Sequence, residues 1–434
     1  MKNIFSILTI FTFAILLVGC SSNEATLSET DDNDNESDNN EPIEITYWYA
    51  WGDIIEQNNL NLVEKFNESQ DEIHVTAEYQ GNYDELHSAT QAAVAAGHAP
   101  EVTQNEIASI GVFAEGGMTE DLTPFVESDE DFDLDDFIPG LMGNSYVDDK
   151  LYGLPYLRST PLMYMNKTLL EESGLDPEGP QNWEELREYA KTITEDQGFP
   201  AISLSVDNWI YEAFLRTNES AITNEDDTEV IFNDEKGVEV LEFWRELHDE
   251  GYMKVATGND ASNVPSQDFA SNRAAFVFSS TANLTANLEI AEEQGFELNA
   301  GFIPKNLQNG VPTGGANLVM TSGLDEEKQQ AAWEFMTFMT DTEQTIYSSE
   351  FTGYLPNRIS AVESEEMLSL YEETPLFKVA VDQLEYAYPR PMPNGIAEVF
   401  QVMTDSVTSA LVDPNADSKE TLDDAAERAQ QLID

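Results

Sequence analysis

The sequence predicts an α/β protein of two lobes, with mixed sheets flanked by helices. First, segments typical of strands alternate with segments typical of helices from Ile43 onward. Second, this alternation starts again after a short segment with Gly and Pro, residues 151–156. Third, two further breaks with Gly and Pro, at 304–315 and 352–356, offer more crossings between the lobes. Each break alone is typical of a surface turn, but a hinge needs only a few such residues, so the set indicates a clamshell.

The first lobe is expected to begin abruptly with β-branched and aromatic residues, which are typical of a strand. Apolar residues at helical spacing, an alternating strand pattern and an Ala-rich segment that ends in Gly follow. This order predicts a largely parallel sheet, whose ligands sit beyond the carboxyl ends of the strands. The expected elements are a strand over 45–49, a helix around 60–66, a strand over 73–77, a helix over 83–97, a strand near 102 and a helix over 107–115.

The second lobe repeats the alternation, and a helical region completes the chain after the last break. Its expected elements are a strand over 162–165, helices over 183–193 and 232–249, and a strand over 273–278. After the break at 304–315, a strand over 318–321 and a helix over 325–339 are expected to return to the first lobe. We therefore assign residues 43–157 and 313–353 to an N-lobe, and residues 158–312 and 354–434 to a C-lobe.

The N-terminus is typical of an export signal. A positive start, Met1-Lys2, precedes an apolar run over 4–18 that is shorter than the about 20 residues needed for a membrane span. The run ends in Leu17-Val18-Gly19-Cys20, which resembles the bacterial lipoprotein box, where a small residue permits cleavage and the Cys thiol becomes lipidated. We therefore expect residues 1–19 to be a lipoprotein signal peptide and Cys20 to carry a lipid anchor.

An acidic segment without basic residues separates Cys20 from the expected folded body. It contains one Leu between Ser21 and Glu41, so it cannot bury enough apolar surface to offset the entropy lost on ordering. We expect residues 20–42 to be a disordered tether.

The chain is strongly acidic, with 84 Asp and Glu against 19 Lys and Arg and a net charge of −65. Nucleic acids and anionic lipids both need a basic surface, so neither is an expected partner. Such a monomer would repel itself at low ionic strength, and we interpret the surface as adapted to a salty medium. An ordinary acidic exported protein is the alternative.

Sequence signatures of catalysis are missing. Cys20 is the single cysteine, so no disulfide can form within the chain and no Cys-based metal site is possible. The four histidines lie in unrelated contexts, and none belongs to a His-Glu-x-x-His motif. No phosphate loop, nucleophile elbow or dinucleotide fingerprint is present. We therefore expect no metal, no cofactor and no enzymatic activity. A glycosidase remains an alternative, because it needs only two carboxylates about 5–10 Å apart.

Short motifs occur in a fixed order along the chain. They are Tyr47-Trp48-Tyr49-Ala50-Trp51, Gly81-Asn82-Tyr83, Tyr152-Gly153-Leu154-Pro155, 159–167, Gly174-Leu175-Asp176-Pro177, Trp183-Glu184-Glu185-Leu186, 314–318 and Thr352-Gly353-Tyr354-Leu355-Pro356. With this set the chain resembles the extracellular solute-binding proteins of carbohydrate-type ABC importers (family 1), most of all the glycerol-3-phosphate-binding proteins, from about Ile43 to the C-terminus. The resemblance implies a type II periplasmic-binding-protein-like clamshell.

In that subfamily, Ser hydroxyls, a Gly amide, a Tyr hydroxyl and an Arg hold the phosphate. The matching positions here are Ser159, Ser279 or Ser280, Gly315, Tyr354 and Arg390. Such a set suits an enclosed anion, which needs several oriented donors, and Arg offers a planar fork of them. A structural salt bridge is the alternative role for Arg390. On this reading, Arg390→Ala is expected to abolish phosphate-ester binding with little loss of stability.

The polyol end of the subfamily's site uses a Tyr, an acid and two Trp. Tyr83, Glu106 and Trp209 match three of these, but Val206 stands where the other Trp is expected, so a different head group or a larger diester is also compatible. Arg158, beside Ser159, is a further candidate for anion binding and departs from the subfamily's pattern.

The resemblance implies a monomeric binding protein, anchored by lipid at the extracytoplasmic face of the cell membrane. Two lobes would close around glycerol-3-phosphate or a glycerophosphodiester, and the closed form would deliver it to the transmembrane subunits of an ABC permease. A neutral mono- or oligosaccharide is the alternative ligand, for which aromatic platforms would matter more than the Ser and Arg set. A lipid-anchored glycosidase is the third possibility.

Overall fold

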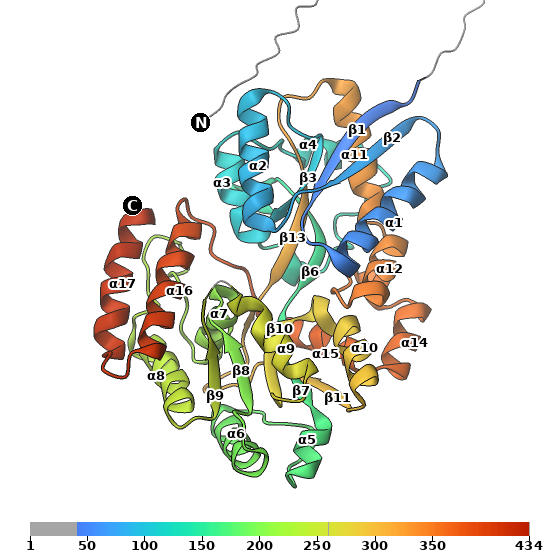
Figure 1. Ribbon diagram of the computed structural model, residues 1–434. Helices are drawn as coiled ribbons and strands as arrows, with labels where there is room; N and C mark the ends of the chain where they lie inside the picture. The colour runs from blue at the N-terminus through green and yellow to red at the C-terminus, as the bar shows by residue number, and fades with distance from the viewer. Residues whose placement is uncertain (1–40, 259, 434) are drawn as a thin grey trace, which may run out of the picture. The chain divides into compact units, whose positions relative to one another are not determined.

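Two five-stranded mixed β-sheets with flanking helices form the framework of the protein (Figure 1). The computed structural model describes residues 41–258 and 260–433. The predicted signal peptide 1–19, the lipidation site Cys20 and nearly all of the tether predicted over 20–42 lie outside these residues. Within the described part of the chain, no helix is both long and apolar enough to cross a membrane.

The first sheet has the strand order β2-β1-β3-β13-β6. Strand β1 pairs in parallel with β2 and β3, whereas β13 is antiparallel to both β3 and β6, which makes the sheet mixed. The strands are β1 (Ile43–Tyr49), β2 (Ile73–Tyr79), β3 (Val102–Glu106), β6 (Leu154–Ser159) and β13 (Gly314–Met320).

The second sheet has the strand order β11-β7-β10-β8-β9. Strand β7 is antiparallel to β10 and β11, and β8 runs parallel to β9 and β10. The strands are β7 (Pro161–Asn166), β8 (Ile202–Ser205), β9 (Met253–Ala256), β10 (Phe276–Ser280) and β11 (Leu298–Gly301). Two short pairs complete the strands: β4 (Tyr146–Val147) with β5 (Lys150–Leu151), and β12 (Val311–Pro312) with β14 (Ala387–Tyr388).

The chain passes from the first sheet to the second at Thr160, the residue that separates β6 from β7. The lobe boundary predicted at 157/158 therefore falls inside β6. The chain returns to the first sheet through β12 and β13, close to the boundary predicted at 312/313. The third predicted boundary, at 353/354, lies between α12 and α13. All three lobe boundaries stay predictions.

Helices occupy most of the connections between strands. Before β6 they are α1 (Asp53–Ser69), α2 (Tyr83–Ala96), η1 (Ile107–Ser109), α3 (Ile110–Glu115), α4 (Thr123–Ser128) and η2 (Pro139–Leu141). Between β7 and β12 they are α5 (Lys167–Glu172), α6 (Trp183–Gln197), α7 (Asn208–Thr217), α8 (Glu235–Asp249), η3 (Ala261–Asn263), α9 (Val264–Ala270), η4 (Thr281–Asn283) and α10 (Leu284–Gln294). After β13 they are α11 (Glu326–Met339), α12 (Thr342–Thr352), α13 (Ile359–Val362), α14 (Glu365–Glu373), α15 (Leu376–Gln383), η5 (Leu384–Tyr386), α16 (Ile396–Val412) and α17 (Ser418–Ile433).

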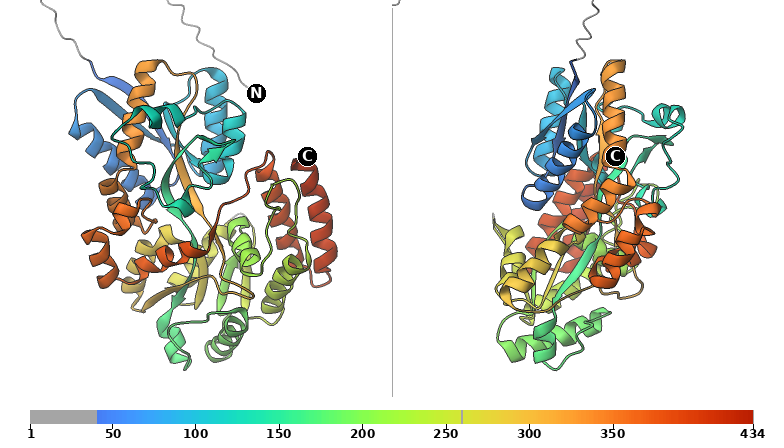
Figure 2. Two further views of the ribbon diagram at one scale, coloured as in Figure 1. Left: turned by 180° about the vertical axis from the view of Figure 1, so that it is seen from behind. Right: turned by 90° about the vertical axis from the view of Figure 1, so that its right-hand side faces the viewer.

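Each sheet has its own apolar core. Around the first sheet, Tyr47 of β1 and Leu318 of β13 pack in one buried cluster with Phe335 of α11. Around the second sheet, side chains of β7, β8 and β10 join those of α16 and α17, which lie side by side (Figure 2). The C-terminal helical region therefore closes the core of the second sheet.

Most elements expected from the sequence are present, and their ends have local causes. The helix predicted over 83–97 is α2, which begins at a reciprocal cap between Asn82 and Glu85 and ends at Gly97 with φ +72°. The helix predicted over 107–115 is divided into η1 and α3.

Several predicted bounds are wrong. The strand predicted over 318–321 is β13 over 314–320, and the helix predicted over 183–193 continues to Gln197 in α6. The helix expected from 232 begins at Glu235, because the Asp234 side chain accepts from the Gly237 amide and caps the helix there. The strand expected from 273 begins at Phe276, because the Arg273 amide is held in a turn by the carbonyl of Asp268 at 2.8 Å.

Candidate functional site

A cleft of about 690 Å³ is lined by residues from both sheets and from the helices that follow their strands. Sites for small molecules have volumes of roughly 300–1,000 Å³, so this cleft is large enough for one. All nine ligand-binding residues predicted from the sequence line it, although their role in binding stays a prediction. They are Tyr83, Glu106, Ser159, Trp209, Ser279, Ser280, Gly315, Tyr354 and Arg390.

Glu106 ends β3 and begins the short helix η1. Its Oε2 accepts from the Ala108 amide at 3.0 Å, and its Oε1 accepts from Arg390 at 3.2 Å. Burial raises the pKa of Glu106, and the Arg390 guanidinium opposes this rise. A carboxylate oxygen has more than one acceptor position, so Glu106 can still accept from a ligand hydroxyl.

The backbone of Glu106 is held by His87 of α2. The Glu106 amide donates to Nε2 of His87 at 3.1 Å, which places the proton of the neutral imidazole on Nδ1. Burial lowers the pKa of His87 to about 4, so the ring is neutral at neutral pH. His87 also packs 5.2 Å from the ring of Phe113.

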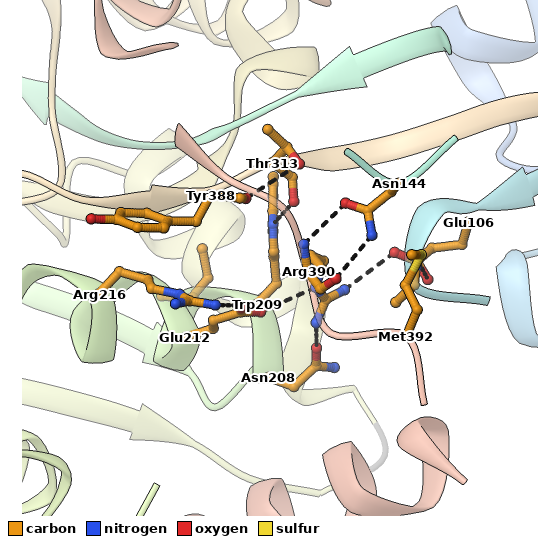
Figure 3. A network of polar contacts seen from close by, with 12 residues as sticks. Glu106, Asn144, Asn208, Trp209, Glu212, Arg216, Thr313, Tyr388, Arg390 and Met392 are labelled. Carbon is orange, nitrogen blue, oxygen red and sulfur yellow. Dashed lines mark hydrogen bonds and ion pairs between the residues drawn. The ribbon is translucent and has the colours of Figure 1, made fainter. Parts of the chain in front are cut away.

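Arg390 lies at the centre of a polar network (Figure 3). Its Nε donates to Glu212 at 3.1 Å and its Nη1 donates to Glu106 at 3.2 Å, while Nη2 donates to the side-chain oxygen of Asn208. The guanidinium also lies 4.4 Å from the ring centroid of Phe400, a cation–π distance. Because Glu106 ends a strand of the first sheet and the other two polar partners belong to α7, Arg390 connects the two halves of the cleft.

The ion pairs of Arg390 are buried. The exposed fraction is 7% for the Arg390 side chain and 0% for that of Glu212. Burial lowers the pKa of Arg390, but the carboxylates of Glu106 and Glu212 raise it by more, so the guanidinium stays charged. Removing one partner of a buried ion pair leaves the other charge uncompensated. The expectation that Arg390→Ala costs little stability therefore no longer holds.

Gly314 and Gly315 make room for the cleft. A Cβ atom on Gly314 would lie 2.3 Å from Cζ2 of Trp209, whose Nε1 donates to the Thr313 carbonyl at 2.9 Å. Gly315 has φ +90°, and a Cβ there would lie 2.0 Å from the carbonyl oxygen of Leu157. The strand also shifts register between Gly315 and the next residue, as in a β-bulge. No residue with a Cβ fits either position without movement of its neighbours.

Three serines end strands at the cleft. Ser159 ends β6, and Ser279 and Ser280 end β10. The Oγ of Ser279 accepts from the Asn283 side chain at 2.6 Å, and the Oγ of Ser280 accepts from the Ala282 amide at 3.1 Å. Because each of these oxygens already accepts a hydrogen bond, its hydroxyl hydrogen is available to an anion in the cleft.

Aromatic residues line much of the same cleft. The ring of Trp51, which is 40% exposed, meets that of Tyr83 edge-on at 5.3 Å. Burial raises the pKa of both Tyr83 and Tyr354, so their hydroxyls keep their protons and can donate. Val206, the position at which the resemblance led us to expect a second Trp, also lines the cleft.

Sequence reasoning missed several residues that shape this site. Asn208 and Glu212 stand four residues apart in α7, a spacing that puts both on one helix face and could have indicated a shared partner. Phe400 and His87 gave no signal that separates them from ordinary helix residues. Asn144 contacts Arg390 across 246 residues of sequence, a contact that no local pattern encodes.

Comparison with known proteins agrees with the fold. Residues 61–378 match the family described as bacterial extracellular solute-binding protein. The sn-glycerol-3-phosphate-binding periplasmic protein UgpB of Pectobacterium atrosepticum is 25% identical over 411 residues, which cover 90% of this chain and 91% of that protein. UgpB of Escherichia coli (strain K12) is 25% identical over 410 residues, covering 90% and 92% of the two chains.

Solved structures of two-lobed binding proteins share the fold. The Mycobacterium tuberculosis UgpB structure, in complex with glycerophosphocholine, has a TM-score of 0.79 at 24% identity and covers 90% of this chain and 98% of that one. The GacH receptor of Streptomyces glaucescens, solved unliganded and with acarbose, has a TM-score of 0.80 at 20% identity with the same coverage. The predicted two-lobed α/β fold is therefore confirmed.

Proposed function

The chain belongs to the bacterial extracellular solute-binding proteins, and we propose that it captures glycerol-3-phosphate or a glycerophosphodiester for an ABC importer. The family assignment favours solute binding over the glycosidase alternative. The ligand proposal draws on the curated UgpB relatives and on the chemistry of the cleft.

One observation carries the proposal: donors suited to an anion converge on a single cleft from distant segments. Ser159, Ser279 and Ser280 present hydroxyls from two sheets, and Tyr354 and Arg390 line the same space. A phosphate that loses its hydration shell needs several oriented donors in its place, and hydrogen bonds to a charged oxygen are stronger than neutral ones. Glu106 and Tyr83 would then accept from and donate to the hydroxyls of the glycerol part.

The proposed mechanism is closure of the two lobes around the solute. The donors come from both sheets, so a bound anion touches all of them only when the halves approach each other. A ligand shifts a conformational equilibrium by its difference in affinity for the two states, and contacts available only in the closed state supply that difference. The closed form would then dock on the permease.

The proposed cellular location rests on the sequence features before Ile43. We propose that the signal over 1–19 exports the chain, that Cys20 carries a lipid, and that residues 20–42 tether the monomeric binding body at the extracytoplasmic face of the membrane. Metabolic labelling with a fatty acid tests this, because incorporation should disappear in Cys20→Ser. Undiminished labelling of that variant would contradict lipidation at this residue.

A thermal-shift panel tests the ligand. Glycerol-3-phosphate and glycerophosphodiesters should raise the melting temperature in a concentration-dependent way, because a ligand that binds only the folded state stabilises it by mass action. Glycerol alone should give no shift at the same concentrations. A shift with maltose-type sugars and none with phosphate esters would overturn the proposal.

A neutral mono- or oligosaccharide is the second candidate, and one observation favours it. The three nitrogens of Arg390 already donate to Glu106, Glu212 and Asn208, so the cation is partly neutralised. Aromatic rings, including those of Trp51 and Trp209, also line the cleft and suit the C–H faces of sugars. The same panel distinguishes the two candidates.

A further inference from the structure

Arg158 is a buried cation that forms no ion pair with an acidic side chain of the described residues. Its exposed fraction is 0%, and it does not line the cleft. Nη1 donates to Oδ1 of Asn317 at 3.0 Å and Nη2 to Oγ1 of Thr313 at 3.4 Å, while Nε has no partner. Among residues 41–258 and 260–433 it forms no ion pair, although buried charges are normally paired.

The backbone of Arg158 is surrounded by candidates for anion binding. Ser159 follows it in β6, Gly315 is its partner across the sheet, and its carbonyl accepts from the Leu355 amide at 2.8 Å, next to Tyr354. All three of these neighbours, Ser159, Gly315 and Tyr354, line the cleft. The backbone of Arg158 is therefore part of the wall on which the phosphate is proposed to bind, and its guanidinium is close enough to Glu106 of that cleft for the two charges to interact.

Arg158 is not needed to balance the ion pairs of the cleft. Arg390 pairs with Glu106 and Glu212, and Arg216 pairs with Glu212 at 3.5 Å, so two guanidinium groups meet two carboxylates. Asp84 and Asp207 also line the cleft and add negative charge at its surface. In a chain with a net charge of −65, a further buried guanidinium without an ion pair among the described residues is suited to a negative ligand.

A chain of side-chain amides joins the two cations. Asn317, which accepts from Arg158, donates to the Asn144 carbonyl at 2.7 Å, and Asn144 in turn contacts the backbone of Arg390. Burial lowers the pKa of Arg158 to about 10, and the nearby Glu106 carboxylate opposes this fall, so the group remains cationic at neutral pH.

We propose that Arg158 is a specificity residue that makes the cleft prefer anionic solutes, and dianionic phosphate monoesters over monoanionic diesters. It acts without touching the ligand, because a charge in a poorly solvated interior is weakly screened. This inference rests on the proposed function, and it narrows the ligand class to a monoester such as glycerol-3-phosphate.

Calorimetric titration at pH 8 with glycerol-3-phosphate and with glycerophosphoglycerol tests the inference. A phosphate monoester is a dianion at this pH, since its second pKa is about 6, whereas the diester carries one charge. Arg158→Gln should lower affinity for the monoester on the order of tenfold and for the diester by clearly less, because the lost Coulomb energy scales with ligand charge. Arg158→Lys keeps the charge and should retain most of the monoester preference.

Two further variants complete the design. Asn317→Asp places a carboxylate beside Nη1 of Arg158, so it should neutralise Arg158 and reduce the monoester preference as Arg158→Gln does. If Arg158→Gln fails to fold, Asn317→Asp alone tests whether the charge of Arg158 sets this preference. Arg187→Gln makes the same chemical change at a side chain that is 42% exposed and away from the cleft, and should leave both affinities unchanged.

The outcomes separate two kinds of failure. If Arg158→Gln loses the same factor of affinity for the monoester and the diester, the role of Arg158 is structural and the inference is overturned. The same holds if Arg158→Lys loses as much monoester affinity as Arg158→Gln. In both cases the proposal that the protein binds phosphate esters still stands. If the wild-type protein binds neutral sugars and no phosphate ester, the proposed function fails and the inference falls with it.

Discussion

Asn144 holds Arg390 by both polar groups of its backbone. The Asn144 Nδ2 donates to the Arg390 carbonyl at 2.9 Å, and its Oδ1 accepts from the Arg390 amide at 3.0 Å. The segment around Arg390 contains Pro389 and Pro391, which restrict the backbone further. The guanidinium therefore projects from a main chain that is fixed from two directions.

Asn144→Ala should weaken glycerol-3-phosphate binding although Asn144 does not line the cleft. The change removes two buried hydrogen bonds, which is expected to lower the free energy of unfolding by about 2 kcal/mol and to release the Arg390 backbone. Urea denaturation and calorimetric titration measure the two effects.

Asn67 provides a matched control for Asn144. Its side chain makes the same pair of bonds to the backbone of Val75, both at 2.9 Å, in the first sheet. Asn67→Ala should lower stability but leave affinity for the ligand unchanged. Equal affinity of both variants would contradict a positioning role for Asn144.

Removing the Arg390 cation should cost stability as well as binding. Arg390→Gln leaves the fully buried Glu212 carboxylate with Arg216 as its one remaining ion-pair partner in the described part of the chain, and breaking a buried pair costs about 3 kcal/mol. The double variant Glu212→Gln/Arg390→Gln removes both charges and should recover part of that loss in urea denaturation. A single variant as stable as the wild type would show that this pair contributes nothing to the fold.

The two glycines of the cleft should differ in their sensitivity to alanine. Gly314→Ala meets the Trp209 ring but has no positive φ, so we expect an overpacking cost of about 1–3 kcal/mol and a displaced Trp209, visible in its fluorescence. Gly315→Ala combines a contact with the Leu157 carbonyl and a strained φ of +90°, so its loss should be larger. Gly323, with φ +85° and open space, is the control for strain alone.

His87 should make the protein sensitive to mild acid. Its folded pKa, about 4, lies below its unfolded value of about 6.5, so the unfolded state binds the proton first as pH falls. The stability from the neutral ring is complete above pH 6.5 and is lost as pH falls from about 6.5 toward 4, at up to about 1.4 kcal/mol per pH unit.

Comparison with His87→Gln isolates this contribution from the titration of the many carboxylates. The variant keeps an acceptor for the Glu106 amide but does not titrate, so its stability should fall less steeply over the same pH window. Parallel stability curves for the two proteins would rule out the proposed role of His87.

Local signals in the sequence, such as helix caps and apolar patterns, predicted most of the helices and strands. The Asn82–Glu85 cap and Gly97 mark both ends of α2, and the prediction agrees with them. The start of β10 was misjudged because the turn at Arg273 depends on the Asp268 carbonyl, which the apolar pattern does not reveal. The start of α8 was likewise misjudged, because the cap by Asp234 is a short-range hydrogen bond that the apolar pattern does not reveal.

In the candidate site, motifs predicted which residues line the cleft but not which of them contact each other. Family motifs placed nine residues that all line the cleft, because motif order reflects strand and helix ends that the fold brings together. The ion pairs of Arg390 with Glu106 and Glu212 join residues 284 and 178 positions apart, so their existence required the structure. The unpaired state of Arg158 was likewise invisible, since a sequence does not show which of 84 carboxylates lies near a given cation.

Small-angle X-ray scattering of the wild-type protein tests the central claim, that two lobes close around a phosphate ester. With saturating glycerol-3-phosphate the radius of gyration should decrease, and with glycerol at the same concentration it should stay at the ligand-free value. Scattering that is unchanged by glycerol-3-phosphate, at a concentration that raises the melting temperature, would contradict closure as the mechanism of capture.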